Sequence, residues 1–278
     1  MVIMMGNVDD PVQSCPGPCD VVIPVVYSNQ PISVPYKSIR DGMTWLQRAA
    51  IDEVESVRQT FTRPDANPPL SIYKETPKGV KVLGLGHAGV AFINGVTGAV
   101  SYYEYGRYDG PGYGLVRSPY TGTVTFDETG NPDPNSFASL MAALTKTNYG
   151  TGQGFEAVYV KVPNGSYEIM KDFADTRMAD IKAKKAAAYD INGNHCFTFA
   201  LEVAGAVGVN ADVSSAEDLE MILINSVTGG RVNTPDGTSI ELPSRQILVL
   251  QQRYKQLKID SSGTVVGNFS FPAGLYSK

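Results

Sequence analysis

The strongest constraint on the fold is a pair of strand-like segments joined by a short turn. Residues 81–93 form an apolar run with interspersed glycines, and residues 99–105 have the aromatic character of a strand. The residues between them, Asn94-Gly95-Val96-Thr97-Gly98, are of the kinds that hairpin turns prefer. Strands joined by so short a turn pair antiparallel. The chain is therefore expected to contain an antiparallel sheet.

Other segments also have strand character. The alternating residues 155–162 predict a strand. Residues 21–26 are β-branched but contain Pro24, whose missing N–H favours an edge strand or an extended arm over a central strand. Residues 227–242 are hairpin-like, whereas the four glycines and two prolines of residues 106–120 predict a long irregular loop.

Several segments place apolar residues every three or four positions, as amphipathic helices do. Asp133-Pro134 supplies a cap and a first-turn proline for one of them, and Ser214 with Glu217 forms a capping-box pattern for another. Helices are expected over residues 38–61, 135–146, 166–188, 197–207 and 245–257, and from Ser214 onward. Because helices and antiparallel strands are mixed without βαβ alternation, the fold class is expected to be α+β.

The composition excludes several functional classes. The 42% of hydrophobic residues suffices for a full core, and the net charge of −5 gives no overall field that would attract nucleic acid. No apolar run approaches the roughly 18 residues that span a bilayer. The first eleven residues have neither the positive nor the apolar region of a signal peptide. The protein is therefore expected to be made in the cytoplasm without a signal peptide, so that any export uses another route.

The cysteines and histidines are too few for a closed disulfide framework or a typical zinc site. Cys15 and Cys19 flank a Pro-Gly-Pro turn, where they can pair once oxidised or stay free in a reducing compartment. The chain has only three Cys and two His, with no CxxC or HxxxH spacing, which disfavours zinc. Neither a metal nor an organic cofactor is expected.

Cys196 is the candidate nucleophile, and His87 is the candidate base. Cys196 lies at the expected start of a helix, where unpaired N–H groups and the helix dipole stabilise a thiolate. His87 stands between glycines in an expected strand, and glycine there marks a close approach by another backbone or a ligand. A neutral imidazole takes a thiol proton near neutral pH. The alternatives are an inert core cysteine and a core histidine with satisfied hydrogen bonds.

Glu104 is the candidate third group, which would orient the imidazole. With a two-residue turn at Gly95-Val96, the numbers of facing residues sum to 191, and Glu104 lies directly opposite His87. Tyr102 and Tyr108 share its parity and are alternative polar partners, and a solvated carboxylate is a further alternative. His195 is a rival base, but neighbours on a helix do not face each other. We expect His195 to cap the helix or to line the opening of the site.

The order histidine, acidic residue, cysteine resembles the circularly permuted papain-like proteins, which include NlpC-type cysteine peptidases and the lecithin:retinol acyltransferase-like group. The matching stretches are Gly86-His87-Ala88-Gly89 and Asn194-His195-Cys196, within residues 82–208. The resemblance implies Cys196 as nucleophile, His87 as base and Glu104 as third polar member. It also implies a papain-like catalytic core over residues 76–210, with an antiparallel sheet packed on helices. Residues 1–75 would form an N-terminal extension of arm and amphipathic helix, and residues 211–278 a C-terminal helical and hairpin extension packed on the core.

The wider chain is similar to cell-wall-cleaving effectors of the bacterial type VI secretion system. That similarity implies a cysteine hydrolase that cleaves amide bonds in peptidoglycan stem peptides and acts against bacteria. It also implies delivery by secretion machinery to the periplasm of a target cell, and an immunity protein as partner. Two alternatives remain open: a thiol acyltransferase or esterase acting on lipids or other esters, and a non-enzymatic binding module in which Cys196 is only part of the core. A broad apolar patch beside the cleft would favour lipid, and a polar groove would favour peptide.

Overall fold

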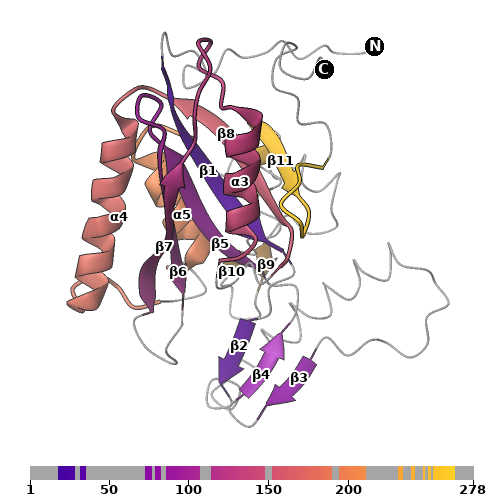
Figure 1. The fold of residues 1–278 in the computed structure, drawn as a ribbon. Helices are drawn as coiled ribbons and strands as arrows, with labels where there is room; N and C mark the ends of the chain where they lie inside the picture. The colour runs from indigo at the N-terminus through magenta and orange to yellow at the C-terminus, as the bar shows by residue number, and fades with distance from the viewer. Residues whose placement is uncertain are drawn as a thin grey trace, which may run out of the picture.

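The architecture is α+β, as the sequence predicted. The computed structural model of the protein describes residues 18–28, 32–35, 73–76, 79–82, 86–106, 114–147, 152–189, 194–210, 231–233, 239–241, 247, 250–251 and 253–266. A six-stranded antiparallel sheet carries helix α3 on one face and helices α4 and α5 on the other (Figure 1). None of the described helices is both long and apolar enough to cross a membrane.

The sheet has the strand order β11-β8-β1-β5-β6-β7, and every neighbouring pair is antiparallel. The strands are β1 (Asp20–Tyr27), β5 (His87–Ile93), β6 (Ala99–Gly106), β7 (Leu115–Thr123), β8 (Phe155–Val162) and β11 (Lys255–Ile259). β1 and β11 therefore belong to the same sheet as β5 and β6, although they come from the predicted terminal extensions. The division of the chain at residues 75 and 210 stays a prediction.

The expectation of an edge strand at residues 21–26 is wrong, because β1 lies inside the sheet between β8 and β5. Its pairing with β5 is continuous, whereas the pairing with β8 is interrupted at Ile23 and Pro24. Pro24 therefore disturbs one ladder only. Every residue of β1 is buried, and burial of its β-branched side chains on both faces outweighs the loss of one hydrogen-bond donor.

Two other expectations fail at the edges of the sheet. β7 occupies part of the predicted irregular loop, and its alternating, largely exposed residues suit an edge strand that tolerates Pro119 and Gly122. The predicted helix over residues 245–257 ends before Lys255, where β11 begins and pairs with β8. The alternating burial of Lys255–Ile259 explains why a strand forms there.

The described helices begin close to the predicted positions. α3 (Pro134–Leu144) is capped by Asp133, whose carboxylate accepts the N–H groups of Asn135 and Ser136. α4 (Ser166–Lys182) ends earlier than predicted, and α5 (Cys196–Gly205) begins at the candidate nucleophile. The predicted helices over residues 38–61 and from Ser214 lie outside the described residues.

Two small antiparallel sheets complete the described secondary structure. One contains β2 (Ile32–Pro35), β4 (Gly79–Val82) and β3 (Tyr73–Thr76) in that order. The other pairs β9 (Arg231–Asn233) with β10 (Ser239–Glu241), which confirms the hairpin predicted over residues 227–242. Cys19, directly before β1, is disulfide-bonded, and Cys15 lies outside the described residues.

The β5–β6 hairpin forms, with a register two residues from the predicted one. Gly89 lies opposite Glu104, and Ile93 opposite Val100. The turn is longer than expected because the Gly98 N–H donates to the Asn94 carbonyl, with Gly98 at a φ of 70° that suits glycine. Since the difference is an even number of residues, Glu104 still shares a sheet face with His87.

Asp20 holds three elements together at one end of the sheet. Its side chain is fully buried at the start of β1. Oδ1 accepts the Gly95 N–H of the hairpin turn at 2.7 Å, and Oδ2 accepts the Tyr167 N–H in the first turn of α4 at 2.8 Å. Both carboxylate oxygens are thus used by backbone donors, one of them at a helix N-terminus where negative charge is favoured.

Replacing Asp20 with Asn should destabilise the protein. Whichever way the amide points, its NH2 group faces a buried backbone N–H, which leaves that donor unsatisfied. We expect a loss of about 1–3 kcal/mol in the free energy of unfolding, measured by urea denaturation. Asp133→Asn is the matched control, because Asn is as good a helix cap as Asp. Equal stability of the two variants would contradict this role of Asp20.

Candidate functional site

The candidate nucleophile Cys196 is the first residue of α5 and is buried, with 2% of its surface exposed. The apolar side chains that follow it, Phe197, Phe199, Ala200 and Val203, are fully buried and pack in the core that covers β1, β5 and β6. Their burial fixes the helix N-terminus against the sheet. Cys196 is a free thiol, placed where first-turn N–H groups lack intrahelical partners.

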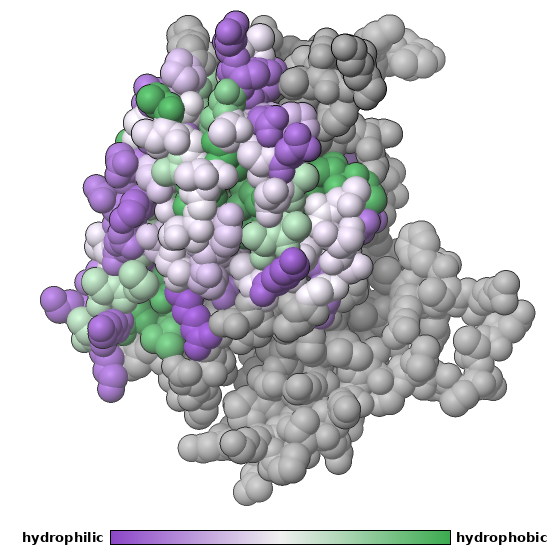
Figure 2. All heavy atoms as spheres, in the orientation of Figure 1, coloured by the Kyte–Doolittle hydropathy of each residue, from purple (hydrophilic) through white to green (hydrophobic). Residues whose placement is uncertain are grey.

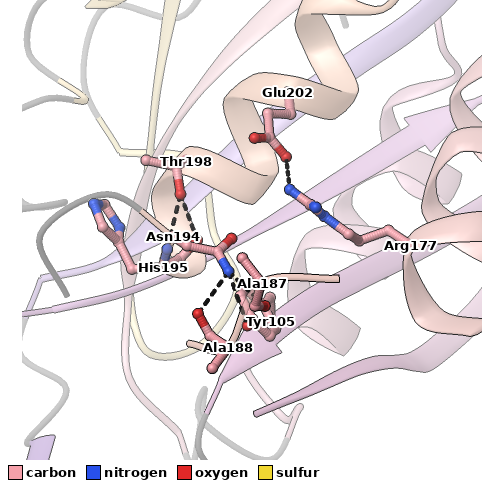
Figure 3. A network of polar contacts seen from close by, with 8 residues as sticks. All are labelled: Tyr105, Arg177, Ala187, Ala188, Asn194, His195, Thr198 and Glu202. Carbon is pink, nitrogen blue, oxygen red and sulfur yellow. Dashed lines mark hydrogen bonds and ion pairs between the residues drawn. The ribbon is translucent and has the colours of Figure 1, made fainter. Parts of the chain in front are cut away.

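The segment before α5 is tied down by polar contacts (Figure 3). Asn194 donates from Nδ2 to the carbonyls of Ala187 and Ala188, at 2.9 and 2.8 Å. Glu202, further along α5, forms an ion pair with Arg177 of α4. These contacts hold the start of α5 relative to α4 and so limit where the sulfur of Cys196 can lie.

His87 is the first residue of β5 and is nearly buried, with 6% exposed. Gly86 precedes it with a φ of 81°, a conformation that favours glycine and turns the chain into the strand. On the neighbouring strand Tyr27 pairs with His87, and the two rings are stacked with centroids 6.5 Å apart. The imidazole is therefore confined by its backbone and by an aromatic neighbour.

The structure brings the three predicted residues together. His87 and Cys196 lie close enough for each to shift the pKa of the other, and His87 Nε2 lies 3.5 Å from Glu104 Oε2. Burial lowers the pKa of His87, but the contacts with Cys196 and Glu104 outweigh it and raise that pKa. Burial raises the pKa of the Cys196 thiol, whereas the contacts with His195 and His87 lower it. Both shifts favour a thiolate–imidazolium pair at neutral pH.

Glu104 is fully buried, and the structure pairs only one of its oxygens. Tyr102 donates from its hydroxyl to Glu104 Oε2 at 3.2 Å, while Oε1 has no hydrogen-bond partner among the described residues. An ionised carboxylate in such a place is costly unless a positive charge compensates it. The imidazolium form of His87 is that charge.

Gly89 makes room for Tyr102 beside Glu104. A Cβ atom at position 89 would lie 2.3 Å from the Tyr102 hydroxyl. The glycine after His87 therefore does mark a close approach, as the sequence indicated, but the group that approaches is a tyrosine side chain. Tyr102 was an alternative to Glu104 as the partner of the imidazole, but in the structure its hydroxyl donates to Glu104. Tyr108, the other alternative, lies outside the described residues.

His195 is the N-cap of α5, as expected for the rival base. Its ring Nδ1 accepts the Phe197 N–H at 3.3 Å, and its backbone N–H donates to the Thr198 hydroxyl at 2.8 Å, which completes a capping box. Sequence reasoning missed its effect on the Cys196 thiol, whose pKa the neighbouring His195 lowers. A histidine at a cap position, where Ser, Thr, Asp or Asn is usual, is the signal that could have drawn attention to it.

The described residues include no group of three or more His, Cys, Asp or Glu side chains arranged to hold a metal ion. The chemistry open to this arrangement is that of a cysteine nucleophile with an adjacent base. The base has an acidic neighbour, as in catalytic triads.

Replacing Glu104 with Gln should lower the pKa of His87, because it removes a negative charge that lies 3.5 Å from the ring. The imidazolium would then lose its proton at a lower pH, by on the order of one pH unit. The chain has only two histidines, so NMR titration of labelled imidazoles resolves His87 directly. Glu128→Gln, on an exposed turn before α3, is the control and should leave that titration unchanged. An identical His87 titration in Glu104→Gln and the unaltered protein would show that Glu104 does not act on the ring.

Comparisons with known proteins agree with the architecture. The sequence model of the TseH-like type VI secretion system effectors matches residues 22–212. A crystal structure of the type VI secretion system effector TseH has the same fold, with a TM-score of 0.57 and 21% sequence identity, covering 90% of this chain and 98% of that one. A search of curated proteins found no match. Because the family match spans more than half of the chain, the protein belongs to the TseH-like family of type VI secretion system effectors.

Proposed function

We propose that this effector is a cysteine hydrolase that cleaves amide bonds in the stem peptides of peptidoglycan. The observation that carries the proposal is the buried contact of Cys196 with His87, whose imidazole also faces Glu104. A core that is only structural gives no reason to place a thiol beside an imidazole. Here the pKa of His87 is raised and that of Cys196 is lowered, and both shifts favour the imidazolium and the thiolate.

In the proposed reaction, the Cys196 thiolate attacks the carbonyl carbon of an amide, and the carbonyl π electrons move to oxygen. The tetrahedral intermediate collapses as the C–N bond breaks, and the His87 imidazolium gives its proton to the leaving amine. Water then attacks the thioester while His87 takes a proton from it, which releases the carboxylic acid and restores the thiolate. Glu104 is a positioning residue that holds the imidazolium.

The proposed core is a circularly permuted papain-like one. Its support is the chain order of strand β5 with the base, strand β6 with the acid and helix α5 with the nucleophile, together with the packing of α5 on that sheet. In this reading the helix start supplies backbone N–H groups to the reaction centre.

The described part of the surface supports a peptide substrate more than a lipid one. The exposed large apolar side chains of the described part are Val96, Ile169 and Val266, which lie on three separate segments. On the face shown in Figure 2, apolar residues are interrupted by hydrophilic ones. A lipid-binding surface needs a contiguous apolar patch, and these residues do not supply one.

Family membership supports the biological setting that we propose. A type VI effector that cleaves peptidoglycan would act against bacteria in the periplasm of the target cell. The producing cell would then need an immunity protein, and the secretion machinery would be a further partner.

Cys196→Ala should abolish cleavage of purified sacculi, because it removes the atom that forms the bond to the substrate. We expect a loss of at least about a thousand-fold in rate, measured by mass spectrometry of released muropeptides. Cys196→Ser is the near-isosteric companion that keeps the packing of α5, and phospholipid vesicles incubated in parallel test for esterase activity. Full cleavage of sacculi by folded Cys196→Ala, or release of fatty acids instead of muropeptides, would refute the proposal.

The reactivity of the thiol separates an enzyme from a binding module in which Cys196 is only core. The lowered pKa predicts that Cys196 reacts with iodoacetamide well below the ordinary thiol pKa of about 8.5. His87→Gln removes the cationic partner and should move the pH midpoint of alkylation upward. Peptide mass mapping identifies the cysteine that reacts. An inert Cys196, or a midpoint that is the same in His87→Gln, would contradict the assigned roles.

A further inference from the structure

We propose that His195, besides capping α5, donates a hydrogen bond from Nε2 to the oxyanion that forms when Cys196 attacks a carbonyl. This inference rests on the proposed role of Cys196 as nucleophile. It assigns to His195 a hydrogen bond to the reacting oxygen, a contact that neither His87 nor Glu104 makes in the proposed reaction.

The first support is the tautomer that the cap imposes. Nδ1 of His195 accepts the N–H of Phe197 at 3.3 Å, so this nitrogen carries a lone pair toward the helix. The ring proton of that imidazole is therefore on Nε2. An Asp cap would accept in the same way but would leave no donor, and the donors that a Ser, Thr or Asn cap would keep lie closer to the backbone than the Nε2–H of a histidine.

The second support is the isolation of that donor. His195 is 1% exposed, and its Nε2 has no hydrogen-bond partner among the described residues. A buried N–H without an acceptor costs free energy in the resting protein. Such a cost is retained at sites where the donor finds its partner during function.

The third support is the position of the ring. His195 is the N-cap residue directly before Cys196, and its ring extends away from the capping contacts with Thr198 (Figure 3). The oxygen of a carbonyl whose carbon bonds to that sulfur lies one bond beyond the carbon. The ring is thus placed to offer a donor beside the carbonyl that Cys196 attacks.

The step requires no proton transfer by His195. The sulfur forms a bond to carbon, the π pair moves to oxygen, and Nε2–H donates a hydrogen bond to that oxygen while keeping its proton. Collapse returns the electron pair to the C=O bond and expels the leaving group, whose proton comes from His87. His195 is free to serve the second tetrahedral intermediate in the same way.

The test compares two reactions of Cys196 in the full chain. Acylation by p-nitrophenyl acetate passes through an oxyanion, whereas alkylation by iodoacetamide does not, and both require the thiolate. In His195→Asn, which keeps a good cap, the ratio of the acylation to the alkylation rate constant should fall by a factor on the order of 10² to 10³. Thr198→Ala removes the reciprocal capping contact but keeps the imidazole, and it should leave the ratio unchanged. His195→Ser offers the same comparison if the Asn variant does not fold.

An unchanged ratio in folded His195→Asn would overturn the inference and leave His195 as a cap alone. An equal fall of both rate constants would also overturn it, because His195 would then act on the thiolate. If neither reagent modifies Cys196 in the unaltered protein, the proposed hydrolase function fails as well. The two failures are therefore distinguishable.

Discussion

The site depends on one constraint: the N-terminus of α5 must be held against the first residue of β5 although both carry groups that can be charged. Burial of the apolar face of α5 in the core over β1 and β5 supplies the force. Charged groups brought along by that burial must be paired, since an isolated buried charge is costly. A thiolate–imidazolium pair of Cys196 and His87, which the pKa shifts of both groups favour, would meet this condition, and Glu104 lies 3.5 Å from the same imidazole.

The imidazole connects the two faces of the sheet. By its alternation His87 belongs with Tyr27 and Glu104 on the face that α3 covers, whereas Cys196 is part of the core on the opposite face. His87 lies near both Glu104 and Cys196 because it is the first residue of β5, where the side chain is not enclosed by paired strands on both sides. A histidine placed further along β5 would be restricted to one face, so its position at the end of the strand is part of the site.

The sequence predicted those parts of the site that depend on residues close together in the chain, and it missed those that depend on distant residues. The existence of the β5–β6 hairpin and the starts of α3, α4 and α5 have local causes, such as glycines at a turn or a cap, and these were predicted to within one residue for the three helices. The central place of β1 depends on which distant strands pair with it, and Pro24 suggested the opposite. The contact of Glu104 with His87 was anticipated from a register that is off by two residues; it forms because parity, not the directly opposite position, decides the shared face. The role of Gly89 could not be read from the chain, because the tyrosine that fills its space is placed by the next strand.

The charges of the site explain why a second donor beside the sulfur is useful. In the proposed resting state, Glu104 and the Cys196 thiolate share one imidazolium, so the negative charge on sulfur is compensated less than in a simple ion pair. In the proposed attack this negative charge moves from sulfur to the carbonyl oxygen, and its total does not change. In our proposal, a donor such as His195 Nε2–H, on the residue directly before Cys196, follows the charge without reorganisation of water, which is the condition under which a fixed dipole lowers a barrier most.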